Sequence, residues 1–342
     1  MNCQKTKTIW TGKNGIFLIA EIGVNHEGQF EVASNLIKLA KQAGVDAVKF
    51  QTYDTFHYIS VSQKERFERT KSFELSQDEF KRLSIIAEDQ KILFLSTPFD
   101  TGSVDFLDTI VPFFKISSGD LTNRELIKRI AKKKKPIILS TGLAVDIEIE
   151  KALQWIEEEV DSDFLRKNVI LLHCVSSYPA PIDQANLLSI PYLKKRFGLP
   201  VGYSDHTMGI QACLTAVALG AVVIEKHFTD KKENRSFRDH AISADPSDMN
   251  LLVDGVKDIK ASLGMYGNER LACERDNLLA MRRGLIATMD LEKGIVLSHD
   301  MITTARPAEG IDISKIDKVL GQKLLKDIYA GCPIKDDCIR WE

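Results

Sequence analysis

The residues best suited to chemistry in this sequence stand at the ends of short apolar runs. Lys49 and Lys115 each lie between two apolar residues, and Ser118, Ser140 and Ser204 follow similar runs. A lone lysine is usually a surface charge on a snorkelling stem, but these two are embedded in apolar sequence. Lysine charges and serine hydroxyls together bind phosphate and carboxylate oxygens. The pattern predicts a site for a small phosphorylated carboxylic acid.

Two histidines form a second candidate group. His206 and His227 end consecutive apolar runs 21 residues apart, so their side chains could share one divalent metal ion and leave positions open for water and substrate. Two hydrogen-bonded structural histidines are the alternative. Glu225 precedes His227 by two residues and faces the same side of a strand, where it could accept or deliver protons. It could also pair with Lys49 or Lys115, and the two roles are compatible.

These residues belong to a repeated alternation of strand-like and helix-like segments. From Ile16 to about Leu263, short runs rich in β-branched residues alternate with longer amphipathic stretches. Eight such repeats predict an α/β fold, a TIM (β/α)8 barrel, whose reacting groups lie at the carboxyl ends of the strands. Ser76 with Glu79 predicts one helix start, and Pro246 predicts another. The expected strands are 16–22, 47–51, 92–96, 113–116, 136–140, 169–173, 200–203 and 222–226.

A doubly wound open sheet is the competing architecture. It usually carries a glycine-rich phosphate turn after an early strand, and the sequence has no GxGxxG or Walker-type string. The barrel is therefore favoured, over residues 1–264. Residues 265–283 are interpreted as a linker and residues 284–342 as a small domain of short strands and turns. Because His173 and Cys174 are adjacent on one expected strand, they face opposite ways, and we interpret Cys174 as a core residue.

Composition and charge argue against several other classes. The chain has 46 Lys and Arg against 48 Asp and Glu, a formal net charge of -2, so it lacks the excess positive charge that holds nucleic acid. It has no run of about 18 apolar residues, and residues 1–13 lack the apolar segment of a signal peptide. The six cysteines show no paired short spacings, which fits a reducing compartment. We expect a cytoplasmic protein with neither nucleic-acid nor membrane partners.

The strings around these residues resemble the sialic acid synthase family, the nonulosonic acid synthases that form N-acetylneuraminate, legionaminate or pseudaminate. The resemblance covers nearly the whole chain, with its motifs in order. In the expected barrel the strings are AEIGVNHEG (20–28), DAVKFQT (46–52), FLSTPFD (94–100), FKISSGD (114–120), ILSTG (138–142), LLHCVSSYP (171–179), GYSDHT (202–207) and EKHFT (225–229). Strings similar to the antifreeze-like (SAF, β-clip) domain of that family are RRGL (282–285), ARPAEGI (305–311) and VLGQKL (319–324).

The resemblance implies a transferase that forms a carbon–carbon bond. Phosphoenolpyruvate would condense with an N-acetylated hexosamine, either N-acetylmannosamine or a 2,4-diacetamido-trideoxyhexose, with water addition and phosphate release. A divalent metal, Mn²⁺ or Mg²⁺, is implied on His206 and His227. The working unit is implied to be a domain-swapped homodimer in which Arg306 reaches the barrel of the other subunit. The implied phosphoenolpyruvate contacts are Lys49, Lys115, Ser118, Ser140, Ser176 and Ser204, and the implied sugar contacts are Glu21, Gln51, Tyr178 and Asp239.

The implied mechanism joins these two halves of the site. The metal would hold the open-chain sugar aldehyde and polarise its oxygen, so that carbon 3 of phosphoenolpyruvate can attack. Water, deprotonated with help from Glu225 or Asp120, would add at carbon 2, and the tetrahedral intermediate would lose phosphate. Lys115 would stabilise the departing charge, and Glu21 completes the implied catalytic set.

Three departures from the family's strings leave the acceptor open. Ser176 stands in place of Asn, Asp120 stands in place of Glu, and FRDHAIS (237–243) replaces a string containing GPD beside the sugar pocket. The acceptor could therefore also be a phosphorylated hexosamine. Two other functions stay open. A barrel metallohydrolase or lyase would need a further carboxylate or a bridging lysine at the metal. A catalytically inactive carbohydrate-binding protein is disfavoured by the intact lysines and histidines.

Overall fold

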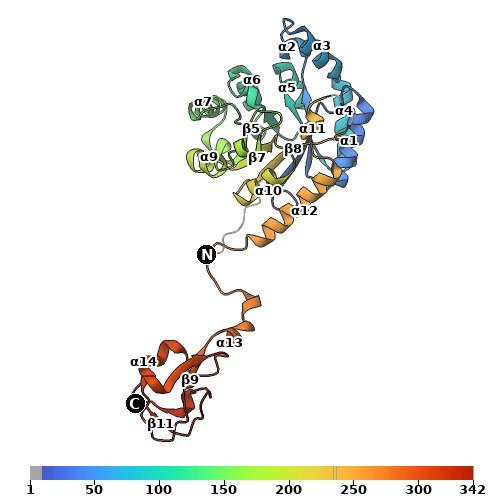
Figure 1. The fold of residues 1–342 in the computed structure, drawn as a ribbon. Helices are drawn as coiled ribbons and strands as arrows, with labels where there is room; N and C mark the ends of the chain where they lie inside the picture. The colour runs from blue at the N-terminus through green and yellow to red at the C-terminus, as the bar shows by residue number, and fades with distance from the viewer. Residues whose placement is uncertain (1–9, 234, 236, 342) are drawn as a thin grey trace. The chain divides into compact units, whose positions relative to one another are not determined.

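Eight parallel strands form a barrel in the computed structural model, which describes residues 10–233, 235 and 237–341. The strands are β1 (Phe17–Gly23), β2 (Ala47–Thr52), β3 (Leu93–Pro98), β4 (Phe114–Ile116), β5 (Ile137–Ser140), β6 (Val169–Cys174), β7 (Val201–Asp205) and β8 (Val223–His227). Their hydrogen-bonded order is β3-β2-β1-β8-β7-β6-β5-β4, and β3 and β4 lie next to each other at the remaining seam (Figure 1). The expected TIM barrel is confirmed.

The period of two along each strand divides its side chains between two cores. Outward-facing residues such as Leu18 pack against the surrounding helices, and inward-facing residues such as Ile19 and Ile138 fill the barrel. The next inward position after Ile19 is Glu21, and the next after Ile138 is Ser140. Each inward row is therefore apolar near the start of its strand and polar at its carboxyl end, which places the polar groups at one mouth of the barrel.

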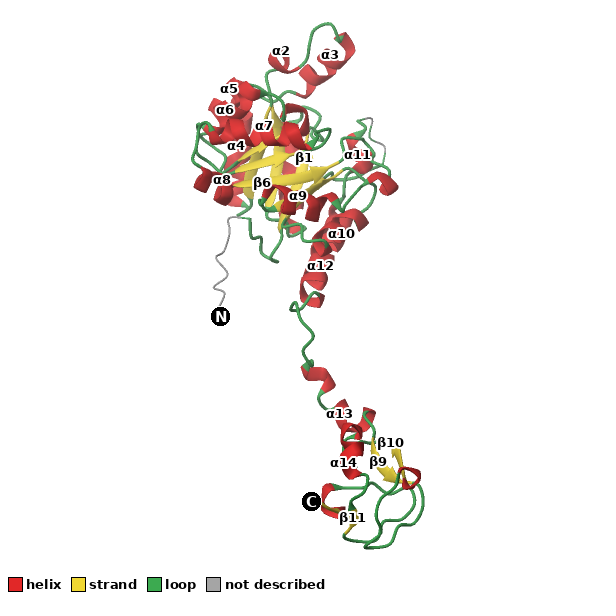
Figure 2. Ribbon diagram, turned by 90° about the vertical axis from the view of Figure 1, so that its left-hand side faces the viewer, coloured by secondary structure: helices red, strands yellow, loops and turns green. Residues whose placement is uncertain are grey.

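Helices cover the outside of this ring of strands (Figure 2). The expected capping box is confirmed at α4 (Gln77–Asp89), where the Ser76 hydroxyl accepts from the Glu79 amide and the Glu79 carboxylate accepts from the Ser76 amide. Pro246 begins α12 (Pro246–Ser262), as expected, and Asp245 caps it. The other helices of the barrel unit are α1 (Phe30–Gln42), α2 (Thr55–Tyr58), α3 (Lys64–Phe73), α5 (Thr101–Leu107), α6 (Arg124–Ala131), α7 (Asp146–Glu157), α8 (Ser162–Asn168), α9 (Ser189–Phe197), α10 (Gln211–Ala218) and α11 (Asp239–Ile242).

The barrel unit ends at Gly264, and a second compact unit begins at Met265. This unit has a small hydrophobic core of its own, to which Leu285 and Ile339 belong. Its elements are α13 (Asn277–Met281), the antiparallel pair β9 (Gly284–Ala287) and β10 (Ile302–Ala305), α14 (Ile316–Val319), and the antiparallel pair β11 (Lys323–Leu324) and β12 (Ile339–Arg340). The stretch interpreted as a linker thus contains the short helix α13.

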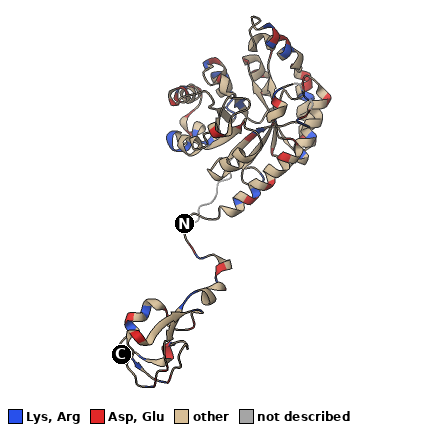
Figure 3. Cartoon of the chain, viewed as in Figure 1, with Lys and Arg blue, Asp and Glu red and all other residues tan. Residues whose placement is uncertain are grey.

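The described cysteines and helices can be compared with the sequence expectations. Residues 1–9 lie outside the described residues. They include Cys3 and most of the segment that was compared with a signal peptide. The described cysteines are free thiols. In the described part of the chain, no helix is both long and apolar enough to cross a membrane. Acidic and basic residues are interspersed along the outer helices of the barrel (Figure 3).

Candidate active site

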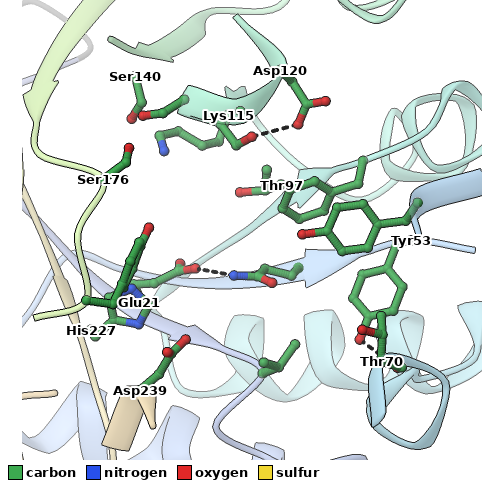
Figure 4. A pocket seen from close by; sticks show the side chains of 18 of the residues that line it. Glu21, Tyr53, Thr70, Thr97, Lys115, Asp120, Ser140, Ser176, His227 and Asp239 are labelled. Atoms are coloured by element: carbon green, nitrogen blue, oxygen red, sulfur yellow. Dashed lines mark hydrogen bonds between the residues drawn. The ribbon is translucent and has the colours of Figure 1, made fainter. Parts of the chain in front are cut away.

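A pocket of about 800 Å³ opens at the carboxyl ends of the barrel strands (Figure 4). It forms where the inward rows of the strands turn from apolar to polar, so its wall is built mainly from strand ends and the loops that follow them. Every barrel residue predicted from the sequence to act in the site lines this pocket. These residues are Glu21, Lys49, Gln51, Lys115, Ser118, Asp120, Ser140, Ser176, Tyr178, Ser204, His206, Glu225, His227 and Asp239.

Two lysines and two carboxylates form one buried charge cluster in the pocket. Lys49 Nζ lies 2.6 Å from Glu21 Oε2 and 3.7 Å from Glu225 Oε2. Lys115 Nζ donates to Glu225 Oε1 at 3.2 Å, and the Ser204 hydroxyl donates to the same oxygen at 2.9 Å. The four charged side chains are at most 5% exposed. A buried charge is costly unless it is paired. The two carboxylates raise the pKa of Lys49 against the effect of burial, whereas burial lowers the pKa of Lys115 despite its contact with Glu225.

The buried environment shifts the pKa values of the two carboxylates in opposite directions. Burial raises the pKa of Glu21 to about 7, and the nearby Lys49 offsets only part of the rise. Burial also opposes ionisation of Glu225, but the two lysines and the Ser204 hydroxyl outweigh it and lower the pKa of Glu225 to about 2. Near neutral pH, Glu21 can therefore take up or release a proton, whereas Glu225 stays ionised.

Hydroxyl and thiol groups converge beside Lys115. The Gly142 amide donates to Ser118 Oγ at 3.0 Å, and this oxygen lies 2.9 Å from Cys174 Sγ. A Cβ atom at position 142 would lie 2.4 Å from Ser176 Oγ and 2.8 Å from both Ser118 Oγ and Cys174 Sγ. Glycine at this position thus allows the loops after β4, β5 and β6 to bring their small polar side chains together.

Cys174 is buried, with 5% of the residue exposed, as its assignment to the core predicts. Its side chain continues the inward row of Ile170 and Leu172 on β6 and also lines the pocket, which was not predicted. His173 faces the other way, where its Nε2 lies 2.8 Å from the carbonyl oxygen of Ala185. The alternation of the two side chains was predicted, but which of them faces inward depends on how β6 enters the barrel.

His206 and His227 lie together at the pocket wall, with ring centroids 5.5 Å apart. His206 Nδ1 lies 2.7 Å from the carbonyl oxygen of Val175. Because a carbonyl only accepts, Nδ1 carries the proton and Nε2 keeps a lone pair. Burial lowers the pKa of both histidines, which favours the neutral form that binds metal.

The histidine pair fits a divalent metal ion. The Nδ1 atom of His227 is buried and has no hydrogen-bond partner in the structure, and a metal ion would satisfy such an atom. Among the described residues, no group of three or more His, Cys, Asp or Glu side chains could hold a metal. A metal bound by the two imidazoles would therefore take its remaining ligands from water and substrate. The further carboxylate that a metallohydrolase would need is not found in this part of the chain.

The residues expected to contact the sugar surround the histidines. Gln51 Nε2 donates to Glu21 Oε1 at 3.4 Å. The ring centroids of Tyr178 and His206 lie 4.1 Å apart, and the Arg238 guanidinium lies over the Tyr178 ring, 5.4 Å from its centroid. Asp239, on α11, is 8% exposed, and Arg238 Nε donates to its Oδ1 at 3.3 Å. This side of the pocket offers hydrogen-bond acceptors and an aromatic face, which suits a polyhydroxylated ligand.

Asp120 lies on the opposite side of the pocket, in the 3-10 turn Ser118–Asp120. Burial raises the pKa of Asp120, although the Ser117 hydroxyl donates to its Oδ2 at 2.6 Å and favours the ionised form. Arg306 belongs to the second unit, where it directly follows β10 and is exposed.

Several pocket residues have no role in the predicted site. Thr97 is a polar residue at the end of the third expected strand, and it accepts a hydrogen bond from Lys49 Nζ at 3.0 Å. Arg66, Arg69 and Arg238 also line the pocket. The two arginines of α3 come from a helix outside the regular βα alternation, so strand ends alone did not point to them.

Comparison with known proteins places the chain in a family. Residues 36–268 match the family model described as NeuB family, and residues 282–340 match the SAF domain. The chain is 40% identical to the N,N'-diacetyllegionaminic acid synthase of Campylobacter jejuni, over 91% of this chain and 96% of that protein. It is 31% identical to the human N-acetylneuraminate-9-phosphate synthase, over 96% of this chain and 94% of that protein.

A solved structure shows the same architecture. The N-acetylneuraminic acid (sialic acid) synthetase of Leptospira borgpetersenii, in complex with citrate, superposes with a TM-score of 0.72 at 37% identity. The match covers 77% of this chain and 90% of the Leptospira protein. The resemblance noted in the sequence is therefore confirmed at the level of the family.

Proposed function

The chain belongs to the NeuB family, and on this premise we propose that it is a nonulosonic acid synthase that condenses phosphoenolpyruvate with an N-acetylated hexosamine. The observation that carries the proposal is the buried cluster of Lys49, Lys115 and Glu225 beside the paired His206 and His227 in one pocket. The cationic half suits a phosphorylated carboxylate, and the histidine half suits a sugar aldehyde.

In this proposal the lysines and serines hold phosphoenolpyruvate. Lys49 and Lys115 exchange part of their contact with the carboxylates for contacts with the anionic oxygens of the ligand. These contacts are charge-assisted hydrogen bonds in a desolvated site. Hydroxyl donors from four strand ends fix the orientation of the phosphate and carboxylate groups, so that carbon 3 faces the acceptor. The donors are Ser118, Ser140, Ser176 and Ser204.

The acceptor sugar lies on the other side of the pocket. Its hydroxyl groups are bound and oriented by the polar side chains on that side, which are Glu21, Gln51, Tyr178 and Asp239. His206 and His227 would hold a divalent metal, Mn²⁺ or Mg²⁺, which supplies Lewis acidity toward the aldehyde oxygen. Because Glu21 has a pKa of about 7, its carboxyl group can also deliver a proton to an oxygen that gains negative charge.

Water addition completes the reaction. After the carbon–carbon bond forms between carbon 3 of phosphoenolpyruvate and the aldehyde carbon, carbon 2 is electron-deficient. Of the two carboxylates expected to accept a proton from the water that adds there, Asp120 is the stronger base, because burial raises its pKa, whereas the two lysines keep Glu225 ionised. The tetrahedral intermediate then breaks its bond between carbon 2 and the phosphate ester oxygen, inorganic phosphate leaves, and Lys115 stabilises its charge. The two substrates and one water give one acid and one phosphate.

The proposal is tested by following phosphate release from phosphoenolpyruvate with a panel of N-acetylated hexosamines. We expect release only when a sugar is present, together with a product whose mass equals sugar plus pyruvic acid. Phosphate release without sugar would indicate a hydrolase. Sugar binding without phosphate release from any member of the panel would indicate an inactive carbohydrate-binding protein.

A further inference from the structure

The turn at residues 25–28 belongs to the string AEIGVNHEG (20–28), but none of its four residues lines the pocket. It follows β1, with Val24 between them. Asn25 and His26 are each 1% exposed, and the Glu27 side chain is 21% exposed. Buried polar groups are costly unless they bind a partner. The partners of this turn therefore indicate its role.

The backbone of the turn has an uncommon conformation. Glu27 has a φ of +49°, a left-handed value that residues other than glycine rarely adopt. Gly28 has a φ of +74°, and a Cβ atom there would lie 2.2 Å from the backbone oxygen of Ser72, near the end of α3. Strained residues persist only where surrounding contacts enforce them, and they are concentrated at functional sites. The conformation of Glu27 thus points to a role for its side chain.

Glu27 binds the short helix that carries Asp239. On α11, the buried His240 donates from Nε2 to Glu27 Oε1 at 2.9 Å, and its Nδ1 lies 2.7 Å from Thr229 Oγ1. Arg235 Nη1 lies 3.7 Å from the same oxygen of Glu27. Asp239 and His240 are successive helical residues, about 100° apart around the helix axis. His240 thus faces the turn, while Asp239 lies in the pocket wall (Figure 4).

Asn25 holds the other end of the same helix. Asn25 Nδ2 donates to the backbone oxygen of Phe228 and to Ser243 Oγ, both at 2.9 Å. Ser243 Oγ in turn donates to the backbone oxygen of Asp239 at 2.6 Å. Phe228 is the residue after β8, and Ser243 is the residue after α11. One side-chain amide therefore joins the end of a barrel strand to the end of α11.

The direction of the Asp239 side chain depends on these contacts. Helix α11 has only four residues, and a helix of this length is not stable by itself. The Asp239 carboxylate accepts from Arg238 Nε at 3.3 Å, but the Arg238 side chain is 72% exposed and is a weak anchor. The backbone of α11, which the turn holds at His240 and at Ser243, therefore determines where the carboxylate points.

We infer that the turn 25–28 is a positioning element for the acceptor sugar, in which Asn25 and Glu27 fix α11 so that the Asp239 carboxylate meets a sugar hydroxyl group. This inference rests on the proposed function, which places Asp239 against the sugar. Asn25, Glu27 and His240 do not line the pocket and act through Asp239. Loss of their contacts should weaken sugar binding and leave phosphoenolpyruvate binding in place, because the phosphoenolpyruvate contacts come from other strand ends.

The test separates the KM values of the two substrates in initial-rate assays of phosphate release with Mn²⁺. The sugar is the N-acetylated hexosamine of the panel that the wild type uses best. Glu27→Ala removes the acceptor of His240 Nε2 and should raise the KM for the sugar by at least about tenfold. The KM for phosphoenolpyruvate should change by less than about twofold. Glu27→Gln keeps a side-chain oxygen that accepts the same bond, and it should bring the KM for the sugar back to within about threefold of the wild type.

Ser243→Ala is a second variant, because it removes only the hydroxyl group that joins Asn25 to Asp239. It should raise the KM for the sugar by at least about threefold, again without an effect on phosphoenolpyruvate. It decides the test if Glu27→Ala does not fold, which far-UV circular dichroism checks. Glu31→Ala is the matched control, since Glu31 is an exposed carboxylate in the first turn of α1. It should leave both KM values unchanged.

A double-mutant cycle tests whether Glu27 acts through Asp239. Asp239→Ala removes the carboxylate, so adding Glu27→Ala to it should raise the KM for the sugar by less than about twofold further. Isothermal titration calorimetry with the sugar gives the Kd where a variant has no turnover. A further loss as large as that in the otherwise wild-type chain would show that Glu27 acts by another route.

Other outcomes would also overturn the inference. These are equal increases in both KM values, or an unchanged KM for the sugar in folded Glu27→Ala and Ser243→Ala. Each of them leaves the proposed function intact, because the wild type still forms the product. Absence of phosphate release from the wild type with every sugar of the panel would instead contradict the proposed function itself.

Discussion

At the scale of a single residue, a substitution of Lys115 should affect the binding of one proposed substrate and not of the other. Lys115→Met keeps the length of the side chain and removes its charge. We expect the KM for phosphoenolpyruvate to rise by about thirtyfold to 150-fold, because a charge-assisted contact in a desolvated site contributes on the order of 2 to 3 kcal/mol. The KM for the sugar should change much less. Initial rates of phosphate release measure both constants. Lys81→Met, at an exposed site on α4, is the control. An unchanged KM for phosphoenolpyruvate in Lys115→Met would show that Lys115 does not bind this substrate.

The histidine pair predicts a dependence on metal. Chelation of the wild type should abolish turnover, and added Mn²⁺ should restore it. His227→Ala should bind no Mn²⁺ in isothermal titration calorimetry and should keep its far-UV circular dichroism, because the barrel core does not depend on the metal. His299→Asn, an exposed histidine of the second unit, should bind Mn²⁺ like the wild type. Full activity of the chelated wild type would contradict the metal assignment.

His26 predicts a loss of stability in mild acid. Burial lowers the pKa of His26 to about 4, whereas an exposed histidine in the unfolded chain titrates near 6.5. Between these values the unfolded state binds a proton that the folded state does not, so stability falls as the pH drops from about 6.5 to 4. The full effect is about 3 kcal/mol, at 1.36 kcal/mol for each pKa unit.

His26→Asn should make the free energy of unfolding of the barrel less dependent on pH over this interval. The Gly28 amide donates to His26 Nδ1 at 3.1 Å, and the side-chain oxygen of Asn can accept the same bond. Urea unfolding at pH 7.5 and pH 5 measures the difference. Equal slopes in wild type and His26→Asn would show that another group causes the acid sensitivity.

At the scale of elements, a buried ion pair joins β7 and β8 behind the histidines. Lys226 Nζ lies 2.8 Å from Asp205 Oδ2, with both side chains at most 1% exposed, and Tyr203 donates to Asp205 Oδ1 at 3.0 Å. Asp205 precedes His206 and Lys226 precedes His227. Neighbouring strand residues face opposite ways. The ion pair therefore lies on the outer face of β7 and β8 and holds the two strands together, while the histidines face the inside of the barrel.

Lys226→Met should therefore destabilise the barrel strongly. It leaves the Asp205 charge buried without its partner, which costs about 3 to 5 kcal/mol. The double variant Asp205→Asn with Lys226→Met should be less destabilised than Lys226→Met alone, because it buries no charge. Urea unfolding measures both. Lys257→Met breaks the exposed pair with Asp254 and should cost less than about 1 kcal/mol. A cost that small for Lys226→Met would mean that the pair does not anchor the strands.

At the scale of the whole molecule, we propose a homodimer in which Arg306 of one protomer serves the barrel of its partner, as the family resemblance implies. Coexpression of an Arg306→Ala chain with a Lys115→Met chain tests this. In the mixed dimer, one barrel has Lys115 and receives Arg306, and the other site carries both lesions. Activity should therefore exceed the mean of the two parent variants and stay below half of the wild type. Purified mixed dimers no more active than that mean would show that Arg306 acts within its own chain or not at all.

Much of the barrel and its mouth was predictable from local sequence patterns. Strand positions follow from short β-branched runs, and the alternation of side chains along a strand is a local property of the backbone. Eight strands in βα order determine a barrel, and a barrel collects its strand ends at one mouth. For this reason the sequence predicts one shared site for the polar residues at the strand ends, namely Glu21, Lys49, Lys115, His206 and His227.

The pairing of Glu225 with Lys49 or Lys115 was expected from the sequence and is confirmed, but the tertiary structure decided its geometry and its effect on the charges. Lys115 and Glu225 are 110 residues apart and meet only because the barrel closes. Burial then moves the pKa values of Glu21 and Glu225 in opposite directions, since desolvation and pairing depend on atoms from several strands. The inward direction of Cys174 and the approach of Arg69 on α3 also depend on packing between distant segments. Local sequence specifies which face of an element a residue occupies, but only long-range packing specifies what that face meets.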